Sequence, residues 1–140
     1  MITETRNYIK GQISSVNADL KQLDDPFGTI DLNENELEFG YKIIFLATDL
    51  IPTGNHNLEI FPISIELYKK VFRDIVEDYD IVFDNAIAIR DKIANIVSVK
   101  ANTNFYRALP VSFTPEDLEL NQRVVKITIT LNFERAISFC

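Results

Sequence analysis

The stretch RVVKITITLNFER at residues 123–135 constrains the fold more than any other part of the chain. Apolar and polar side chains alternate strictly from Val125 to Glu134, and a period of two residues indicates a β-strand with one buried and one wet face. The apolar set is Val125, Ile127, Ile129, Leu131 and Phe133. Such a strand is typical of an antiparallel sheet that packs other elements against one face.

The stretch LEIFPISIELYKKVF at residues 58–72 has a second strand pattern, but its two faces differ. The face that is entirely apolar carries Phe61, Ile63, Ile65 and Leu67. The other face mixes apolar, polar and charged side chains and includes Pro62, which has no N–H to donate to a sheet. We therefore interpret this stretch as an edge strand whose mixed face is covered by a loop or, as we predict, by a neighbouring molecule.

Two segments have the helical period. From Thr3 to about Leu23, apolar residues recur at spacings of three and four, and Thr3 is the expected N-cap. From Asp80 to about Asn95 a second apolar stripe recurs in the same way, with Asp78 or Asp80 as N-cap. Each helix has one apolar stripe and needs a sheet to cover it.

The rest of the chain supplies further strands and loops. The expected strands are EFGYKIIFLAT at 38–48, VSVKA at 97–101 and NFYRALPVSF at 104–113. We expect DLIPTGNHN at 49–57 to be a turn or loop, and TPEDLELN at 114–121 to be a loop or a single helical turn. The strand pair 38–48 and 58–72 is expected to be antiparallel.

Together these elements predict an α+β fold, with an antiparallel or mixed sheet of four to five strands and two helices packed mainly on one face. At 140 residues the chain has the size of one domain, so we expect a single domain over 1–140. Its 46% hydrophobic and 25% charged residues are typical of globular proteins.

Charge and cysteine content exclude several classes of function. The net charge of −7 argues against non-specific binding to nucleic acid or to an anionic membrane, and favours a protein partner. Cys140 is the only cysteine, so the chain has no internal disulfide and no cysteine-based metal cluster. The chain has no long apolar run and no signal-like N-terminus, so we expect a soluble intracellular protein.

The acidic connection at 24–38 contains the best match to a metal site. Asp31, Asn33 and Asn35 occupy the first three ligand positions of a calcium loop. The required glycine is replaced by Glu36, and Lys42 stands where the bidentate glutamate belongs. We interpret this segment as a solvated acidic loop, with weak calcium binding left open.

A search for catalytic groups gives none. His56 is the only histidine, and it has neither a second histidine for zinc nor a cysteine to activate. The sequence has no G-x-S-x-G elbow and no glycine-rich phosphate loop. We predict no enzyme activity, no catalytic or metal-binding residues and no cofactor.

Aromatic and apolar residues outside the expected core are the better candidates for function. Phe105 and Tyr106 are adjacent in a strand pattern, so they point to opposite faces and only one enters a single core. The same reasoning applies to the mixed face of 58–72. The predicted subunit-interface residues are Leu58, Ile60, Pro62, Tyr68, Phe72 and Tyr106.

The element order consists of an N-terminal helix, an acidic loop, the strand pair YKIIFLAT and LEIFPISIELYKKVF, a helix DYDIVFDNAIAIRDKIANI and a final strand RVVKITITLNFE. This order resembles the tail-terminator, or tail-completion, proteins of long-tailed bacteriophages. The resemblance covers nearly the whole chain and rests on length, order and pattern, with no signature motif.

The resemblance implies a structural virion protein, assembled in the host cytoplasm. Such a subunit forms a hexameric ring that caps the tail tube and joins it to the neck connector, so its partners are copies of itself, the tail-tube protein and a neck protein. No cofactor, specific nucleic-acid binding or membrane is implied, and no site residue is carried over. Other neck or tail-tube components stay open, as does a small ligand-binding or regulatory domain with a pocket between sheet and helices.

Overall fold

The long strands β4 and β6 form the centre of the sheet and pair antiparallel over their full length, from His56 opposite Ser138 to Lys70 opposite Val124. A computed structural model describes residues 2–22, 39–46, 49–53, 56–71, 75–117 and 124–138. The strands are β1 (Lys21–Gln22), β2 (Phe39–Phe45), β3 (Asp49–Thr53), β4 (His56–Lys70), β5 (Arg107–Asp117) and β6 (Val124–Ser138). The helices are α1 (Ile2–Val16), α2 (Ile75–Ile93) and α3 (Ile96–Asn102).

The sheet is mixed, and its main order is β1-β2-β4-β6-β5, with β3 pairing β4 beside the end of β2. Only the β1–β2 pair is parallel. The predicted α+β class is confirmed, although the sheet has six strands because β3 and the two-residue β1 add to the expected ones. The predicted antiparallel pairing of β2 with β4 is confirmed.

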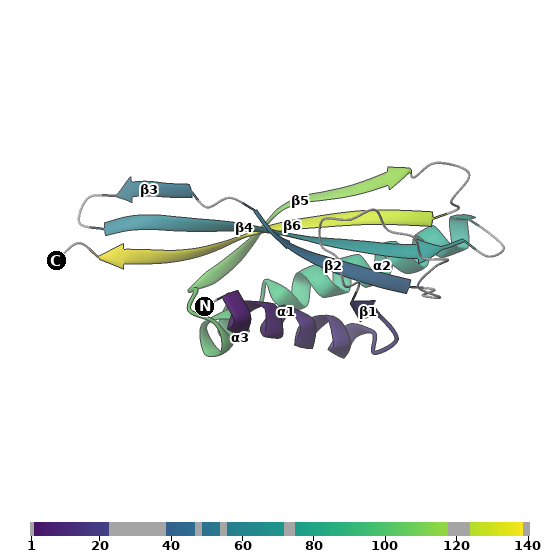
Figure 1. Cartoon of the computed structure of the whole chain (residues 1–140), viewed down its shortest axis with the longest axis horizontal. Coiled ribbons are helices and arrows are strands. Elements are labelled where there is room, and N and C mark those ends of the chain that lie inside the picture. The colour runs from purple at the N-terminus through teal and green to yellow at the C-terminus, as the bar shows by residue number, and fades with distance from the viewer. Residues whose placement is uncertain are drawn as a thin grey trace.

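All three helices lie on one side of the sheet (Figure 1). Helix α2 packs on β4 and β6, α1 packs on α2, and α3 packs on β5. The alternating apolar residues of the final strand are all buried beneath them, as predicted: Val125, Ile127, Ile129, Leu131 and Phe133. Four residues of the predicted stripe are buried as well, at Val82, Ala86, Ile89 and Ile93, whereas its last predicted residue, Ile96, begins α3 and is 51% exposed. The other face of the sheet has no described helix over it.

The interpretation of residues 58–72 as an edge strand is wrong, because β4 has partners on both sides. On one side, β2 pairs with Ile63–Lys69 of β4 and β3 pairs with His56–Ile60. Pro62 falls in the interval between these two partners, and its carbonyl accepts a hydrogen bond of 2.9 Å from the N–H of Leu46. A central strand accommodates the proline here because one neighbour has ended and the next has not begun.

Three other predictions of local structure are corrected. Residues 97–101 belong to α3, which the Asn95 side chain caps by accepting a 3.1 Å hydrogen bond from the N–H of Ser98. The predicted loops contain β3 and the end of β5, since pairing with a long central strand outweighs the proline and glycine signals.

The first helix ends at Val16, earlier than predicted, and Thr3 lies inside it. Helix α2 begins at Ile75, so Asp78 lies in its first turn and Asp80 follows within the helix. Residues 23–38, including the possible calcium ligands Asp31, Asn33 and Asn35, lie outside the described residues.

Candidate interaction surface

The face of the sheet opposite the helices divides into a polar half and an apolar half. Cross-strand register places the even-numbered residues of β4 and β6 side by side on this face, with Tyr68 opposite Lys126 at one end and Leu58 opposite Ala136 at the other. Because both central strands run the length of the sheet, the side chains form continuous rows.

The polar half is tied together by an ion pair. The Lys126 ammonium lies 2.7 Å from the Glu66 carboxylate, and the Tyr68 hydroxyl donates a 3.0 Å hydrogen bond to the same carboxylate. The Lys126 ammonium also lies 5.6 Å from the centroid of the Tyr68 ring, within range of a cation–π contact. Burial, together with the negative charge of Glu66, raises the pKa of Tyr68.

Tyr68 was predicted as an interface residue, and it does lie on the same face as Leu58 and Ile60. Its side chain is buried within the chain and engaged by Glu66 and Lys126. A substitution at Tyr68 would therefore disturb folding before it reported on any contact with a partner.

Two threonines of β6 also belong to the polar half, and they differ in whether the hydroxyl has a hydrogen-bond partner. The hydroxyls of Thr130 and Ser64 lie 3.1 Å apart and form a hydrogen bond across β4 and β6. The Thr128 hydroxyl oxygen is buried and has no hydrogen-bond partner among the described residues. A buried hydroxyl without a hydrogen-bond partner costs stability, so Thr128 and Thr130 are expected to contribute differently to it.

The apolar half forms a surface that we call the apolar strip: Leu46, Leu58, Ile60, Pro62 and Leu109. Leu46 and Leu109 are 45% and 40% exposed, and the three residues of β4 between them are partly buried. Leu46 reaches the strip because it continues the ladder of β2 opposite Pro62, and Leu109 because it lies opposite Asn132. The strip joins residues from three separate segments of the chain.

The predicted residues Leu58, Ile60 and Pro62 are thus brought together, whereas Leu46 and Leu109 were missed. Leu46 follows Ile44 at a spacing of two, so its alternation with β2 was a signal that could have found it. Leu109 carries no such signal, because its position depends on the register of β5 against β6. Phe72 lies outside the described residues.

Tyr106 lies at the border of the strip, where β5 begins. Its hydroxyl donates a 3.4 Å hydrogen bond to Glu134, and the Arg107 guanidinium pairs with the same carboxylate. The Glu134 hydrogen bond and charge raise the pKa of Arg107. Phe105 enters the core and packs edge-on against Phe61 and Phe133, so the two adjacent aromatic residues do separate between core and surface.

Two of the strands at the edges of the described sheet, β5 and β3, contain prolines. Strand β5 carries Pro110 and Pro115 with an irregularity at Val111, and β3 carries Pro52. A proline offers no N–H, and bulges twist an edge away, so these strands are poor templates for adding a strand from another molecule.

A second feature is an open depression of about 400 Å³ on the helical side. Its lining residues come from α1 and α3: Glu4, Asn7, Tyr8, Gly11, Gln12 and Asn102. The lining surface is divided about evenly between polar and apolar atoms. The Tyr8 hydroxyl points away into the fold, where it donates a 2.8 Å hydrogen bond to the Ile93 carbonyl.

The residues considered for chemistry do not form a site in the part of the chain that is described. No group of three or more His, Cys, Asp or Glu side chains there could hold a metal ion. His56 begins β4, where it pairs with Thr53 and Ser138 in the ladder. Among the described helices, none is long and apolar enough to cross a membrane. No protein-family model matches the chain, and no curated protein matches it in sequence.

Proposed function

We propose that this chain is a structural subunit that associates with other protein chains through the apolar strip, as a ring-forming tail terminator or tail-completion protein of a long-tailed bacteriophage. The ring would cap the tail tube and join it to the neck connector. The proposal assigns the chain no catalytic role and no cofactor. Its partners are further copies of the chain, the tail-tube protein and a neck protein.

One observation carries the proposal. The described helices all lie on one face of the sheet, and the other face presents an apolar strip in which Leu46 and Leu109 are substantially exposed. Exposed apolar surface bordered by polar groups such as the Glu134 cluster is typical of protein interaction sites. The proline-containing outer strands also favour a contact made by side chains on this face. The phage assignment itself rests on the resemblance in element order.

The test is to image the purified chain by negative-stain microscopy, alone and with the tail-tube protein of the same phage. Ring-shaped particles, or rings at the ends of tubes, are expected for the natural chain. Ile60→Asp places a charge in the middle of the strip and should abolish them. Ile2→Asp is the control, because Ile2 is 48% exposed on α1, away from the strip.

If the natural chain, Ile2→Asp and Ile60→Asp all form rings equally well, the apolar strip has no role in ring assembly. A natural chain that forms no rings under either condition would contradict the ring proposal itself. Circular dichroism of each variant separates lost association from lost folding.

A small ligand-binding or regulatory domain is the second candidate, favoured by the depression between α1 and α3. It differs from the predicted pocket, because it lies between two helices rather than between sheet and helices. Calorimetry with calcium tests the metal-binding form of this candidate: heat at millimolar calcium would support it, and no heat would count against it.

A further inference from the structure

The two most exposed large apolar side chains of the described residues lie on different helices: Val97 of α3 is 72% exposed and Val76 of α2 is 63% exposed. Single exposed apolar residues are common and need no explanation. These two differ because Val76 lies among the exposed carboxylates of α2, whereas Val97 lies on the helix that carries Lys100.

The first surface, which we call the acidic face of α2, consists of Val76, Glu77, Asp80 and Asp84. At 3.6 residues per turn, these four lie opposite the buried stripe of the helix, and all four are exposed. The three carboxylates make no hydrogen bond or ion pair within the described part of the chain. Negative charge here faces outward, unlike that of Asp78, which pairs with Lys69.

The second surface, which we call the basic end, consists of Val97, Lys100 and Arg107. Val97 and Lys100 are three residues apart on α3 and so lie on neighbouring positions of one helix face. Arg107 begins β5, which packs against α3. Its side chain is 40% exposed and pairs with the buried carboxylate of Glu134, so Lys100 supplies the net positive charge of this surface.

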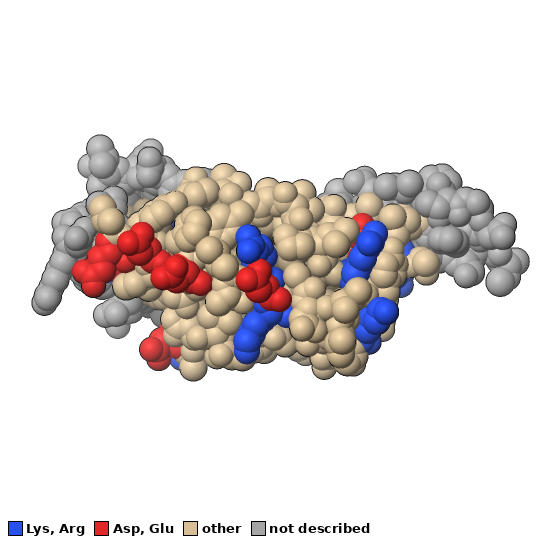
Figure 2. Space-filling view, turned by 180° about the vertical axis from the view of Figure 1, so that it is seen from behind, with Lys and Arg blue, Asp and Glu red and all other residues tan. Residues whose placement is uncertain are grey.

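The two surfaces lie toward opposite ends of the long axis. Helix α2 begins at one end of the molecule, and α3 with the start of β5 lies toward the other (Figure 1). Figure 2 shows acidic side chains gathered at the end where α2 begins and basic side chains toward the other end. The two surfaces therefore cannot meet within one chain.

We propose that the acidic face of α2 of one copy docks against the basic end of a second copy. Opposite charges and an exposed valine on each side make the surfaces complementary. A contact between two different surfaces of identical chains is heterologous, so it repeats from copy to copy and closes a ring when the rotation between copies allows. The inference rests on the proposed function, to which it adds a second contact between copies, made by residues other than those of the apolar strip.

A charge swap tests the contact, with association of the purified chain measured by sedimentation velocity at low salt. Asp84→Lys and Lys100→Glu should each weaken association by at least about tenfold, because each places like charges together. The two changes combined in one chain should restore part of the association, since positions 84 and 100 then again carry opposite charges. Lys21→Glu is the control for Lys100→Glu, because Lys21 is exposed on β1, at the opposite edge of the sheet from β5.

Disulfide trapping tests the geometry. With Cys140 replaced by Ser, Asp84→Cys and Lys100→Cys chains are prepared separately and mixed. A mixture that gives several-fold more cross-linked dimer than either chain alone, and more than a mixture of Asp84→Cys with Lys21→Cys, supports the contact. Cross-linking of the mixture no greater than that of the separate chains overturns it.

The outcomes separate this inference from the proposed function. Rings that form equally well with Asp84→Lys or Lys100→Glu overturn the docking contact and leave the ring proposal standing. If the cysteine variants give specific cross-links but the chain never forms rings, the docking contact is supported and the ring proposal is contradicted. A natural chain that neither associates nor cross-links overturns the contact.

Discussion

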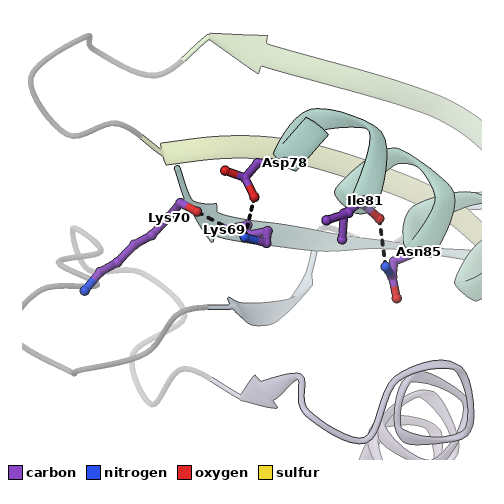
Figure 3. A network of polar contacts seen from close by, with 5 residues as sticks. All are labelled: Lys69, Lys70, Asp78, Ile81 and Asn85. Carbon is purple, nitrogen blue, oxygen red and sulfur yellow. Dashed lines mark hydrogen bonds and ion pairs between the residues drawn. The ribbon is translucent and has the colours of Figure 1, made fainter. Parts of the chain in front are cut away.

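The Lys69 ammonium lies 2.7 Å from the carboxylate of Asp78, and this ion pair ties the end of β4 to the first turn of α2. Figure 3 shows the pair between the strand and the helix, with the Lys69 ammonium also donating a 3.3 Å hydrogen bond to the Lys70 carbonyl. Both side chains are nearly buried. This ion pair, which we call the clamp, therefore fixes the position of the first turn of α2 over the sheet.

Asp78→Asn should destabilise the fold by about 3 kcal/mol, because it removes a carboxylate that pairs with the Lys69 charge in a largely buried site. Asp91→Asn is the matched control in the same helix. Asp91 pairs with Arg90 but its side chain is 63% exposed, so a loss of about 0.5 kcal/mol or less is expected. Urea unfolding measures both, and equal losses would contradict the role of the clamp.

Thr128→Val should leave stability unchanged or raise it by up to about 1 kcal/mol, because it removes a buried hydroxyl that lacks a partner. Thr130→Val is the same substitution two residues along β6, and it should cost about 1 kcal/mol because Ser64 loses its hydrogen bond. Thermal unfolding of the two variants separates these expectations. A clear loss in Thr128→Val would mean that its hydroxyl is paired.

Tyr8 links α1 to the end of α2 and gives the fold a dependence on alkaline pH. Burial raises the pKa of Tyr8 to about 12, from an ordinary value of 10.0. The unfolded chain loses this proton first, so the contribution of Tyr8 is complete below pH 10 and is lost as pH rises from 10 to about 12.

Tyr8→Phe should cost about 1 kcal/mol at neutral pH, because the hydrogen bond to the Ile93 carbonyl is removed. It should also reduce the fall in stability between pH 10 and 12 relative to the natural chain. Urea unfolding as a function of pH measures both effects. An unchanged alkaline fall would show that other groups account for it.

Gly11→Ala should stabilise the chain by about 0.5–1 kcal/mol. Gly11 lies within α1, and an added Cβ would meet no atom within 4 Å. Alanine loses less backbone entropy than glycine in a helix, so the gain is available without a clash. Thermal unfolding measures it, and a lower midpoint for Gly11→Ala would show that the site needs glycine.

The sequence predicts the parts of the fold that have a clear period. The alternation from Val125 to Phe133 and the stripe from Val82 to Ile93 identify a strand and a helix, and both have the predicted face buried. Residues 97–101 were misread because an alternating pattern of only five residues fits a strand or a short helix equally well, and Asn95 as a cap decides for the helix.

The sequence pattern does not show which strands pair when they lie far apart in the chain. Pro62 indicates an edge when β4 is considered alone, and only the register shows that one neighbour ends beside it and another begins beyond it. Only part of the apolar strip could be predicted, because it too depends on how the strands pair. Leu58, Ile60 and Pro62 share a strand, whereas Leu109 joins them through the pairing of β5 with β6.

The most direct test of the account is the mass of the assembly formed by the natural chain and by Leu46→Asp, measured by light scattering with and without the tail-tube protein. Leu46 is 45% exposed in the strip, so its variant should keep the fold. The account predicts assemblies of several 16.1 kDa chains for the natural protein and for Ile2→Asp, with association at least about tenfold weaker for Leu46→Asp. A folded Leu46→Asp chain that assembles as well as the natural chain would contradict it.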